Sequence, residues 1–117
     1  KPVVELLFAD PALVTRQLLD DLLKYKRIDG VGEVLSSLGQ ALFAEGRQRE
    51  QPGVELAATG VPVLVVWGRE DRVIPPAQAA TAPKGAKVEV IDGAGHMAMM
   101  EKPKTINQLI RGHIAEQ

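Results

Sequence analysis

The fold is decided by residues 61–75, whose sequence is VPVLVVWGREDRVIP. The apolar part of this stretch is short and continuous, is rich in β-branched valines, and lies between Pro62 and Gly68. A run of this kind without polar alternation is typical of a strand that is buried on both faces, as strands are in a parallel sheet. The polar residues that follow it then form a loop at the carboxyl end of the strand.

A second strand is predicted at residues 86–93, AKVEVIDG. The residues between the two strands include PPAQAATAP and have helical or loop character, and their number suits a crossover between parallel neighbours. The tail at residues 102–117 predicts an amphipathic helix with Pro103 near its start. The residues expected to face the sheet are Ile106, Leu109, Ile110 and Ile114.

The first half of the chain predicts two helices and a linker. The first covers residues 9–30, with Asp10 as N-cap, Pro11 at the first helical position and Gly30 as the stop. The second covers residues 32–45, and residues 45–53 form a polar linker broken by proline and glycine. The chain therefore divides into a helical segment with its linker, residues 1–53, and a strand-helix-strand-helix part, residues 54–117.

Composition excludes several classes of function. The formal net charge is −1 and no basic stripe is present, so nucleic-acid binding has no electrostatic support. There is no cysteine, which fits a cytoplasmic location and excludes thiolate metal sites and a cysteine nucleophile. The two histidines and the carboxylates show no metal-ligand spacing, and no apolar run reaches the roughly 20 residues of a membrane span. We expect no cofactor and no metal in this chain.

Two polar residues follow the predicted strands, Asp71 after the first and His96 after the second. Ligands of an open parallel sheet bind outside the carboxyl ends of its strands, so these residues are expected on one rim. A histidine that acts as a general base needs a carboxylate on its far ring nitrogen, which fixes the tautomer and stabilises the imidazolium. Gly93 and Gly95 let the backbone turn sharply before the histidine. Asp71 and His96 are therefore the predicted catalytic residues.

The two loops, GREDRVIP and GAGHMAMMEKP, resemble the acid and histidine loops of the α/β-hydrolase fold family. In that family the acid loop commonly has the pattern Gly-x-x-Asp-x-x-x-Pro, and the histidine loop has Gly-x-Gly-His followed by Glu-x-Pro. The matching positions are Gly68, Asp71, Pro75, Gly93, Gly95, His96, Glu101 and Pro103. The acid precedes the histidine in the chain, as it does in the family. The resemblance covers residues 54–117.

The resemblance implies an α/β fold in which residues 1–53 belong to a helical cap. The sequence of that segment is also similar to the hydrolase-like acyltransferase component of acetoin dehydrogenase complexes. It implies acetyl transfer between a dihydrolipoamide group and coenzyme A, and other components of the complex as partners. General esterase or hydrolase activity on a small-molecule acyl substrate, and a non-catalytic binding module, remain as alternatives.

The family's nucleophile motif, Gly-x-Ser-x-Gly, does not occur in the sequence. The chain begins at Lys1 within an apolar pattern, so we expect it to be the carboxyl-terminal part of a longer enzyme, with its serine upstream. On its own it should be inactive. The free edge of the first strand would lack its neighbour, and an unpaired apolar edge recruits other chains. We therefore expect a homodimer or larger assembly.

Several residues have a second interpretation. Asp71 could be only a turn residue, Glu70 is the alternative acid, and His96 could be structural. Glu101 either caps the last helix or binds loop backbone. The remaining side chains are interpreted as packing residues: Trp67 at the strand end, Met97, Met99 and Met100 as core and pocket wall, and His113 in the last helix.

Overall fold

The computed structural model describes residues 1–50 and 52–116. Its centre is a parallel pair of strands, β3 (Leu64–Gly68) and β4 (Lys87–Ile91), with Leu64 opposite Lys87 at one end and Gly68 opposite Ile91 at the other. Both predicted strands and their parallel pairing are confirmed. The two strands therefore end together, at the edge where the acid and histidine loops begin.

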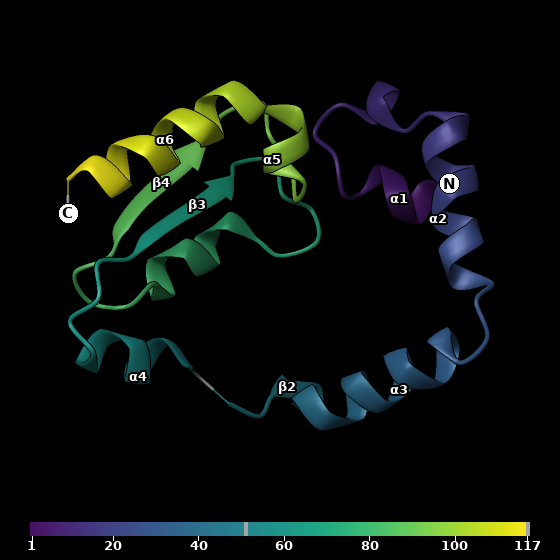
Figure 1. The fold of residues 1–117 in the computed structure, drawn as a ribbon, viewed down its shortest axis with the longest axis horizontal. Coiled ribbons are helices and arrows are strands. Elements are labelled where there is room, and N and C mark those ends of the chain that lie inside the picture. The colour runs from purple at the N-terminus through teal and green to yellow at the C-terminus, as the bar shows by residue number, and fades with distance from the viewer. Residues whose placement is uncertain (51, 117) are drawn as a thin grey trace.

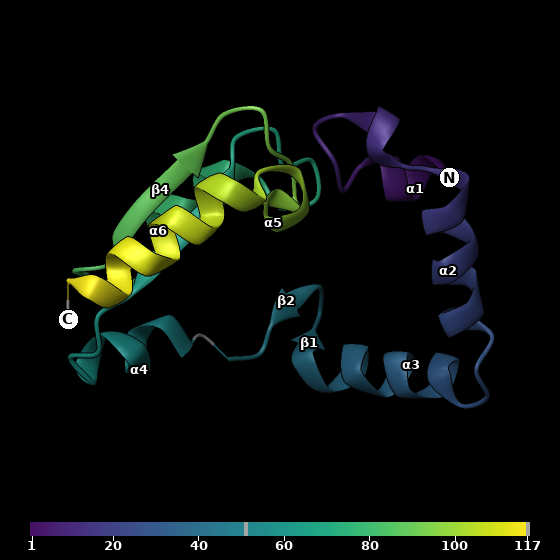
Figure 2. The same ribbon diagram turned by 45° about the horizontal axis from the view of Figure 1, so that its top comes forward.

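Helices cover the two faces of this sheet (Figures 1 and 2). Helix α6 (Pro103–Ala115) packs over Val66 and Ile91 through Ile106, together with the buried alanines Ala94 and Ala98. The 3-10 helix η2 (Pro76–Thr81), which forms the connection between the strands, borders Val88 and Val90 on the other face. The resulting core is small and lies directly beneath the strand ends.

The prediction that β3 is buried on both faces is wrong, because Leu64 to Trp67 are only half-buried. Among the described residues β3 pairs with β4 alone, so its outer edge has no neighbouring strand. The missing neighbour at this edge also explains why part of the apolar face of helix α6 is exposed. Ile106 is buried as predicted, whereas Ile110 and Ile114 are 45% and 66% exposed above the groove beside β3.

The first half of the chain differs from its prediction at the helix starts. After the short helix α1 (Pro2–Glu5), Asp10 caps only the 3-10 turn η1 (Pro11–Leu13), where its carboxylate accepts the N–H of Ala12. Helix α2 (Arg16–Lys26) starts afresh, with the hydroxyl of Thr15 accepting the N–H of Leu18. The chain has non-helical dihedral angles at Val14, so the predicted single helix is divided into two elements.

The second helix is shorter than predicted, and the described part of the predicted linker contains regular structure. Helix α3 (Val31–Leu42) ends before a small hairpin, β1 (Phe43–Ala44) and β2 (Arg47–Gln48), whose turn residues Glu45 and Gly46 have positive φ. Proline and glycine then start helix α4 (Pro52–Ala58) instead of breaking the chain, because proline is well tolerated in a first helical turn. This helix spans the predicted boundary at residues 53 and 54.

Helices α2 and α3 form an arm that projects from the sheet (Figures 1 and 2). The loop that follows α1, before the arm begins, lies beside the short helix α5 (Ala98–Glu101). The sequence pattern did not predict α5. Within the described part of the chain, no helix combines the length and apolar character needed to cross a bilayer.

Candidate active site

Asp71 lies in a tight turn three residues after β3. Its side chain is 4% exposed, and one carboxylate oxygen, Oδ1, accepts the backbone N–H groups of Val73 at 2.8 Å and Ile74 at 2.9 Å. This is the turn role that the sequence allowed. It uses one oxygen and leaves the other, Oδ2, directed towards the histidine loop, so the turn does not prevent Asp71 from binding the histidine.

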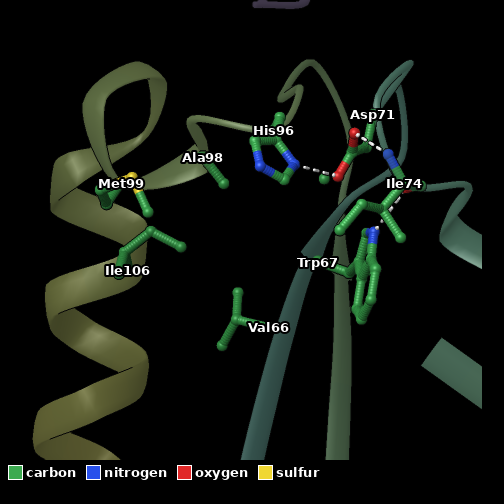
Figure 3. Close-up of a pocket in the computed structure, with 9 residues that line it drawn as sticks. Val66, Trp67, Asp71, Ile74, His96, Ala98, Met99 and Ile106 are labelled. Atoms are coloured by element: carbon green, nitrogen blue, oxygen red, sulfur yellow. Dashed lines mark hydrogen bonds and ion pairs between the residues drawn. The ribbon is translucent and has the colours of Figure 1, made fainter. Parts of the chain in front are cut away.

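His96 meets that second oxygen. Its ring nitrogen Nδ1 lies 2.9 Å from Asp71 Oδ2, although the two residues are 25 positions apart in the chain (Figure 3). An ionised carboxylate only accepts hydrogen bonds, so Nδ1 carries the donated proton. A proton exchanged with a substrate would then use the opposite ring nitrogen, Nε2. The side chain of His96 is 32% exposed, which leaves the ring accessible.

The surroundings of Asp71 favour its ionised form. Burial by itself would raise its pKa, but the N–H of Ile74, the His96 ring and the N–H of Val73 together outweigh burial and hold the pKa of Asp71 below its ordinary value. The carboxylate is therefore charged at neutral pH. In that state it can orient the imidazole ring and stabilise a positive charge on it.

The acid and histidine loops contact each other through backbone. The N–H of Glu70 donates to the carbonyl of Ala94 at 3.0 Å, and a side chain on Gly68 would overlap the carbonyl oxygens of Ala94 and Gly95. Glu70, the alternative acid, accepts the N–H of Ala94 at 3.1 Å. The structure therefore brings Asp71 to the histidine, while Glu70 joins the two loops.

Glu101 binds loop backbone, which was one of its two predicted roles. Its carboxylate accepts the N–H of Gly95 and also those of Ala9 and Asp10. The other role is wrong, because the N-cap of α6 is Lys102 and that helix has no side-chain cap.

Arg72 was missed by sequence reasoning. Its guanidinium donates to the carbonyls of Glu5 and Phe8. Its place beside Asp71 was the one available signal for it, and the partners lie more than sixty positions away in the chain.

A cavity of about 270 Å³ opens beside the Asp71–His96 pair (Figure 3). Its walls are mostly apolar, and the two polar side chains lie together at the strand ends (Figure 3). The lining residues are Val66, Trp67, Gly68, Asp71, Ile74, His96, Ala98, Met99 and Ile106. The site thus combines a hydrogen-bonded carboxylate–imidazole pair with an apolar wall.

The predicted packing residues have mixed outcomes. Trp67 donates its indole N–H to the carbonyl of Ile74 and also forms part of the cavity wall. Met97 is half-buried, and Met99 lies in the cavity wall as predicted. Met99 and Met100 are exposed, so the prediction that these two are core residues is wrong. His113 lies 3.4 Å from the carbonyl of Pro62, which agrees with a packing role. In the described ranges no group of three His, Cys, Asp or Glu side chains is arranged to hold a metal ion.

Comparisons with known proteins identify the family and several relatives of the chain. The family model described as the alpha/beta hydrolase fold matches residues 8–103. The chain is 60% identical over 114 residues to the dihydrolipoyllysine-residue acetyltransferase component of the acetoin cleaving system of Cupriavidus necator, covering 97% of this chain and 30% of that protein. It is 47% identical to the component of the same name from Pseudomonas putida, covering 92% of this chain and 28% of that one.

A solved structure shares the fold. The crystal structure of a meta-cleavage product hydrolase, CumD, matches with a TM-score of 0.80 at 23% sequence identity, covering 99% of this chain and 44% of that one. At this identity the similarity concerns the arrangement of the chain. The chain spans less than half of the length of each of these three proteins.

Proposed function

The chain belongs to the alpha/beta hydrolase fold family, and on that premise we propose that it supplies the acid and the histidine of a serine acyltransferase. The observation that carries this proposal is the bond between His96 Nδ1 and Asp71 Oδ2 at 2.9 Å. A histidine bound in this way keeps Nε2 for proton transfer, and its buried carboxylate balances the imidazolium that forms.

We assign the proton transfers to His96. As a general base, Nε2 removes the proton of a serine hydroxyl while the serine oxygen forms a bond to the acyl carbon. As a general acid, the imidazolium returns that proton to the leaving thiolate when the carbon–sulfur bond breaks. A second thiol then loses its proton to His96, and its sulfur bonds to the acyl carbon. The imidazolium returns that proton to the serine oxygen as the ester bond breaks. Asp71 holds the ring throughout and stays ionised.

The names of the two curated relatives support a choice of acyl group and acceptor. Both are named as acetyltransferase components that act on a dihydrolipoyllysine residue. We propose that this chain takes part in moving an acetyl group between a dihydrolipoyl thiol and coenzyme A, which act as substrates, and that other components of an acetoin-cleaving system are its partners. The identity of 60% over nearly the whole chain supports this choice over a general esterase.

The nucleophile in this proposal lies outside the 117 residues. The pattern Gly-x-Ser-x-Gly does not occur in the sequence. The two relatives are each more than three times as long as the stretch that they share with this chain. Residues 1–53 would then be part of a helical cap, and residues 54–117 the end of the hydrolase core.

The test is a thiol-transfer assay on the complete protein that contains this chain. Acetyl coenzyme A and dihydrolipoamide are mixed with the protein, and formation of the acetyl-dihydrolipoamide thioester is followed. We expect His96→Ala to lower turnover by about a thousand-fold or more, because general acid–base catalysis and activation of the nucleophile are both lost. His113→Ala is the matched control, since it removes a histidine of α6 that is bonded to Pro62 backbone.

The outcomes separate the proposals. Release of acetate without thioester formation would replace the transferase by a hydrolase of the same fold. Full activity of His96→Ala, measured as thioester formation or as release of acetate, would overturn the catalytic assignment altogether.

A further inference from the structure

A short segment of the first half, residues 5–10, lies against both site loops. Arg72, next to Asp71 in the acid loop, donates to the carbonyls of Glu5 at 2.6 Å and Phe8 at 2.8 Å. Met97, next to His96, donates its N–H to the carbonyl of Leu7 at 2.9 Å. The ribbon shows the same approach, with the loop that follows α1 next to α5 (Figures 1 and 2). The two catalytic residues thus have chain neighbours attached to one common segment.

Glu101 fixes this segment to the histidine loop. Its Oε1 accepts the N–H of Ala9 at 2.7 Å and that of Asp10 at 3.2 Å, while Oε2 accepts the N–H of Gly95 at 2.5 Å. Gly95 directly precedes His96. One carboxylate therefore connects backbone groups that are more than eighty positions apart in the chain. One of these groups belongs to Gly95, the residue directly before His96.

The fit at Gly95 allows no side chain. A Cβ there would lie 2.7 Å from the nitrogen of Ala9 and 2.8 Å from the carbonyl carbon of Phe8, both backbone atoms. Phe8 itself is 2% exposed, so the segment is packed as well as hydrogen-bonded. Glycine at 93 and 95 gives the loop wide conformational freedom, with φ at +68° for Gly93. Contacts outside the loop must restrict that freedom for the ring to hold one position.

We propose that Glu101 is a positioning residue for His96: by binding residues 9, 10 and 95 together, its carboxylate sets the distance between the His96 ring and Asp71. Arg72 does the corresponding work on the acid side, so the segment at residues 5–10 is the common support of both loops. This inference rests on the proposed function, since it assumes that His96 is the base. The bond between His96 Nδ1 and Asp71 can be observed without any assay of turnover.

Glu101→Gln tests the carboxylate with almost no change of shape. An amide has one accepting oxygen, so in either orientation its NH₂ group faces a backbone N–H, at Gly95 or at Ala9 and Asp10. The matched control is Glu116→Gln, which removes an exposed carboxylate at the end of α6 that is 3.5 Å from Lys87. Both variants are made in the complete protein that contains this chain.

The first readout is the proton on His96 Nδ1, observed by NMR with ¹⁵N-labelled histidine and assigned by its loss in His96→Gln. A ring N–H bonded to a carboxylate resonates far downfield of a free one. We expect the signal in the unchanged protein and in Glu116→Gln, and its loss or a clear upfield shift in Glu101→Gln. The second readout is turnover, where we expect kcat to fall about ten- to a hundred-fold with little change in KM, as for displacement of a catalytic group by a fraction of an ångström to an ångström.

Asp71→Asn separates the two proposals. A downfield signal that is insensitive to Asp71→Asn would overturn the pair on which the proposed function rests. A signal that depends on Asp71 but is unchanged in Glu101→Gln would overturn the positioning role alone. If Glu101→Gln does not fold, Glu101→Asp is measured instead. It keeps the charge but is one methylene shorter, so it cannot reach both sets of N–H groups; there too an unchanged signal overturns the inference.

Discussion

The helical arm, α2 and α3, and the two site loops reverse the usual relation between regularity and burial. The arm has good helical patterning, yet neither helix contributes a buried residue within the described chain. The site loops are largely irregular, yet they contain buried Asp71 and Ala94. An apolar stripe is stable only when another surface covers it, whereas backbone groups and carboxylates can satisfy one another locally. The loops therefore hold their geometry through hydrogen bonds to each other and to residues 5–10, whereas the described chain leaves the apolar side chains of the arm uncovered.

The strongest test of this contrast is catalytic. Asp71→Asn keeps an oxygen for the turn N–H groups but presents an NH₂ group to His96 Nδ1, which forces the ring into the wrong tautomer. We expect acetyl transfer by the complete protein to fall about a thousand- to ten-thousand-fold, as when the acid of a triad is replaced by its amide. Lys26→Gln at the end of α2 is the control and should keep full activity. A loss of less than ten-fold for the asparagine variant would contradict the role of Asp71.

Glycine substitutions compare the two regions by stability. Gly68→Ala would drive a methyl group into the carbonyl oxygens of Ala94 and Gly95, so we expect a loss of about 2–4 kcal/mol in the free energy of unfolding. Gly39→Ala, in the middle of α3, meets no described atom within 4 Å and should stabilise the chain by about 0.5–1 kcal/mol. Urea denaturation of both variants measures the difference. Equal effects would mean that the loops are as loosely packed as the arm.

Features that depend on local sequence could be predicted, whereas contacts between distant parts of the chain could not. Both strands, their parallel pairing, the start of α6 and the Asp71–His96 pair were predicted, because these depend on local apolar runs and on which residues follow a strand end. The break between η1 and α2 was missed, since Pro11 and Thr15 each offer a helix start and nothing local chooses between them. The contacts of Glu101 with Ala9 and of Arg72 with Phe8 were also missed, because they join backbone groups that carry no side-chain signature.

Burial was predicted least well. The valines of β3 and the leucines of the arm have the composition of core residues, and the sequence cannot say which surface covers them. Leu35 and Leu38 are 58% and 49% exposed, and Val66 is half-buried. The pattern thus gives the direction in which a residue faces, and a neighbouring element determines whether it is buried.

Acid should weaken the site loops in a way that depends on Asp71. Its pKa is held below the ordinary value of about 4, so its ionised form stabilises the folded chain fully above that pH and the stabilisation is lost as the pH falls through the lower pKa of the folded state. Asp71→Asn removes this dependence and should cost about 1–2 kcal/mol at neutral pH, roughly one hydrogen bond to a charged group. Urea midpoints between pH 2 and 6 measure it, with Asp20→Asn in the arm as the control. Parallel acid limbs for both asparagine variants and the unchanged chain would refute the assignment.

The arm and the free edge of β3 lead to a prediction about association. Large apolar side chains are exposed on α2, α3 and α6, and β3 has a row of backbone groups that no described strand pairs. We expect the 117-residue chain, expressed alone, to form a homodimer or larger assembly at tens of micromolar, a working range in which exposed apolar surface associates. Sedimentation velocity measures this. A stable monomer would mean that the exposed surface is too dispersed to bind a second copy.

The smallest expected effect is none at all. The 117-residue chain holds the acid and the histidine at bonding distance but has no Gly-x-Ser-x-Gly motif, so a correct proton-transfer pair should exist without the group that it serves. We therefore expect the chain alone to hydrolyse p-nitrophenyl acetate no faster than its His96→Ala variant, although the downfield Nδ1 proton is present. The two measurements together separate positioning from catalysis: an intact pair with no turnover places the missing chemistry in the nucleophile and in the groups that stabilise the oxyanion. Turnover that His96→Ala abolishes would contradict this, since a nucleophile would then have to lie within these residues, with the hydroxyls of Ser36 and Ser37 on the arm as the first to replace.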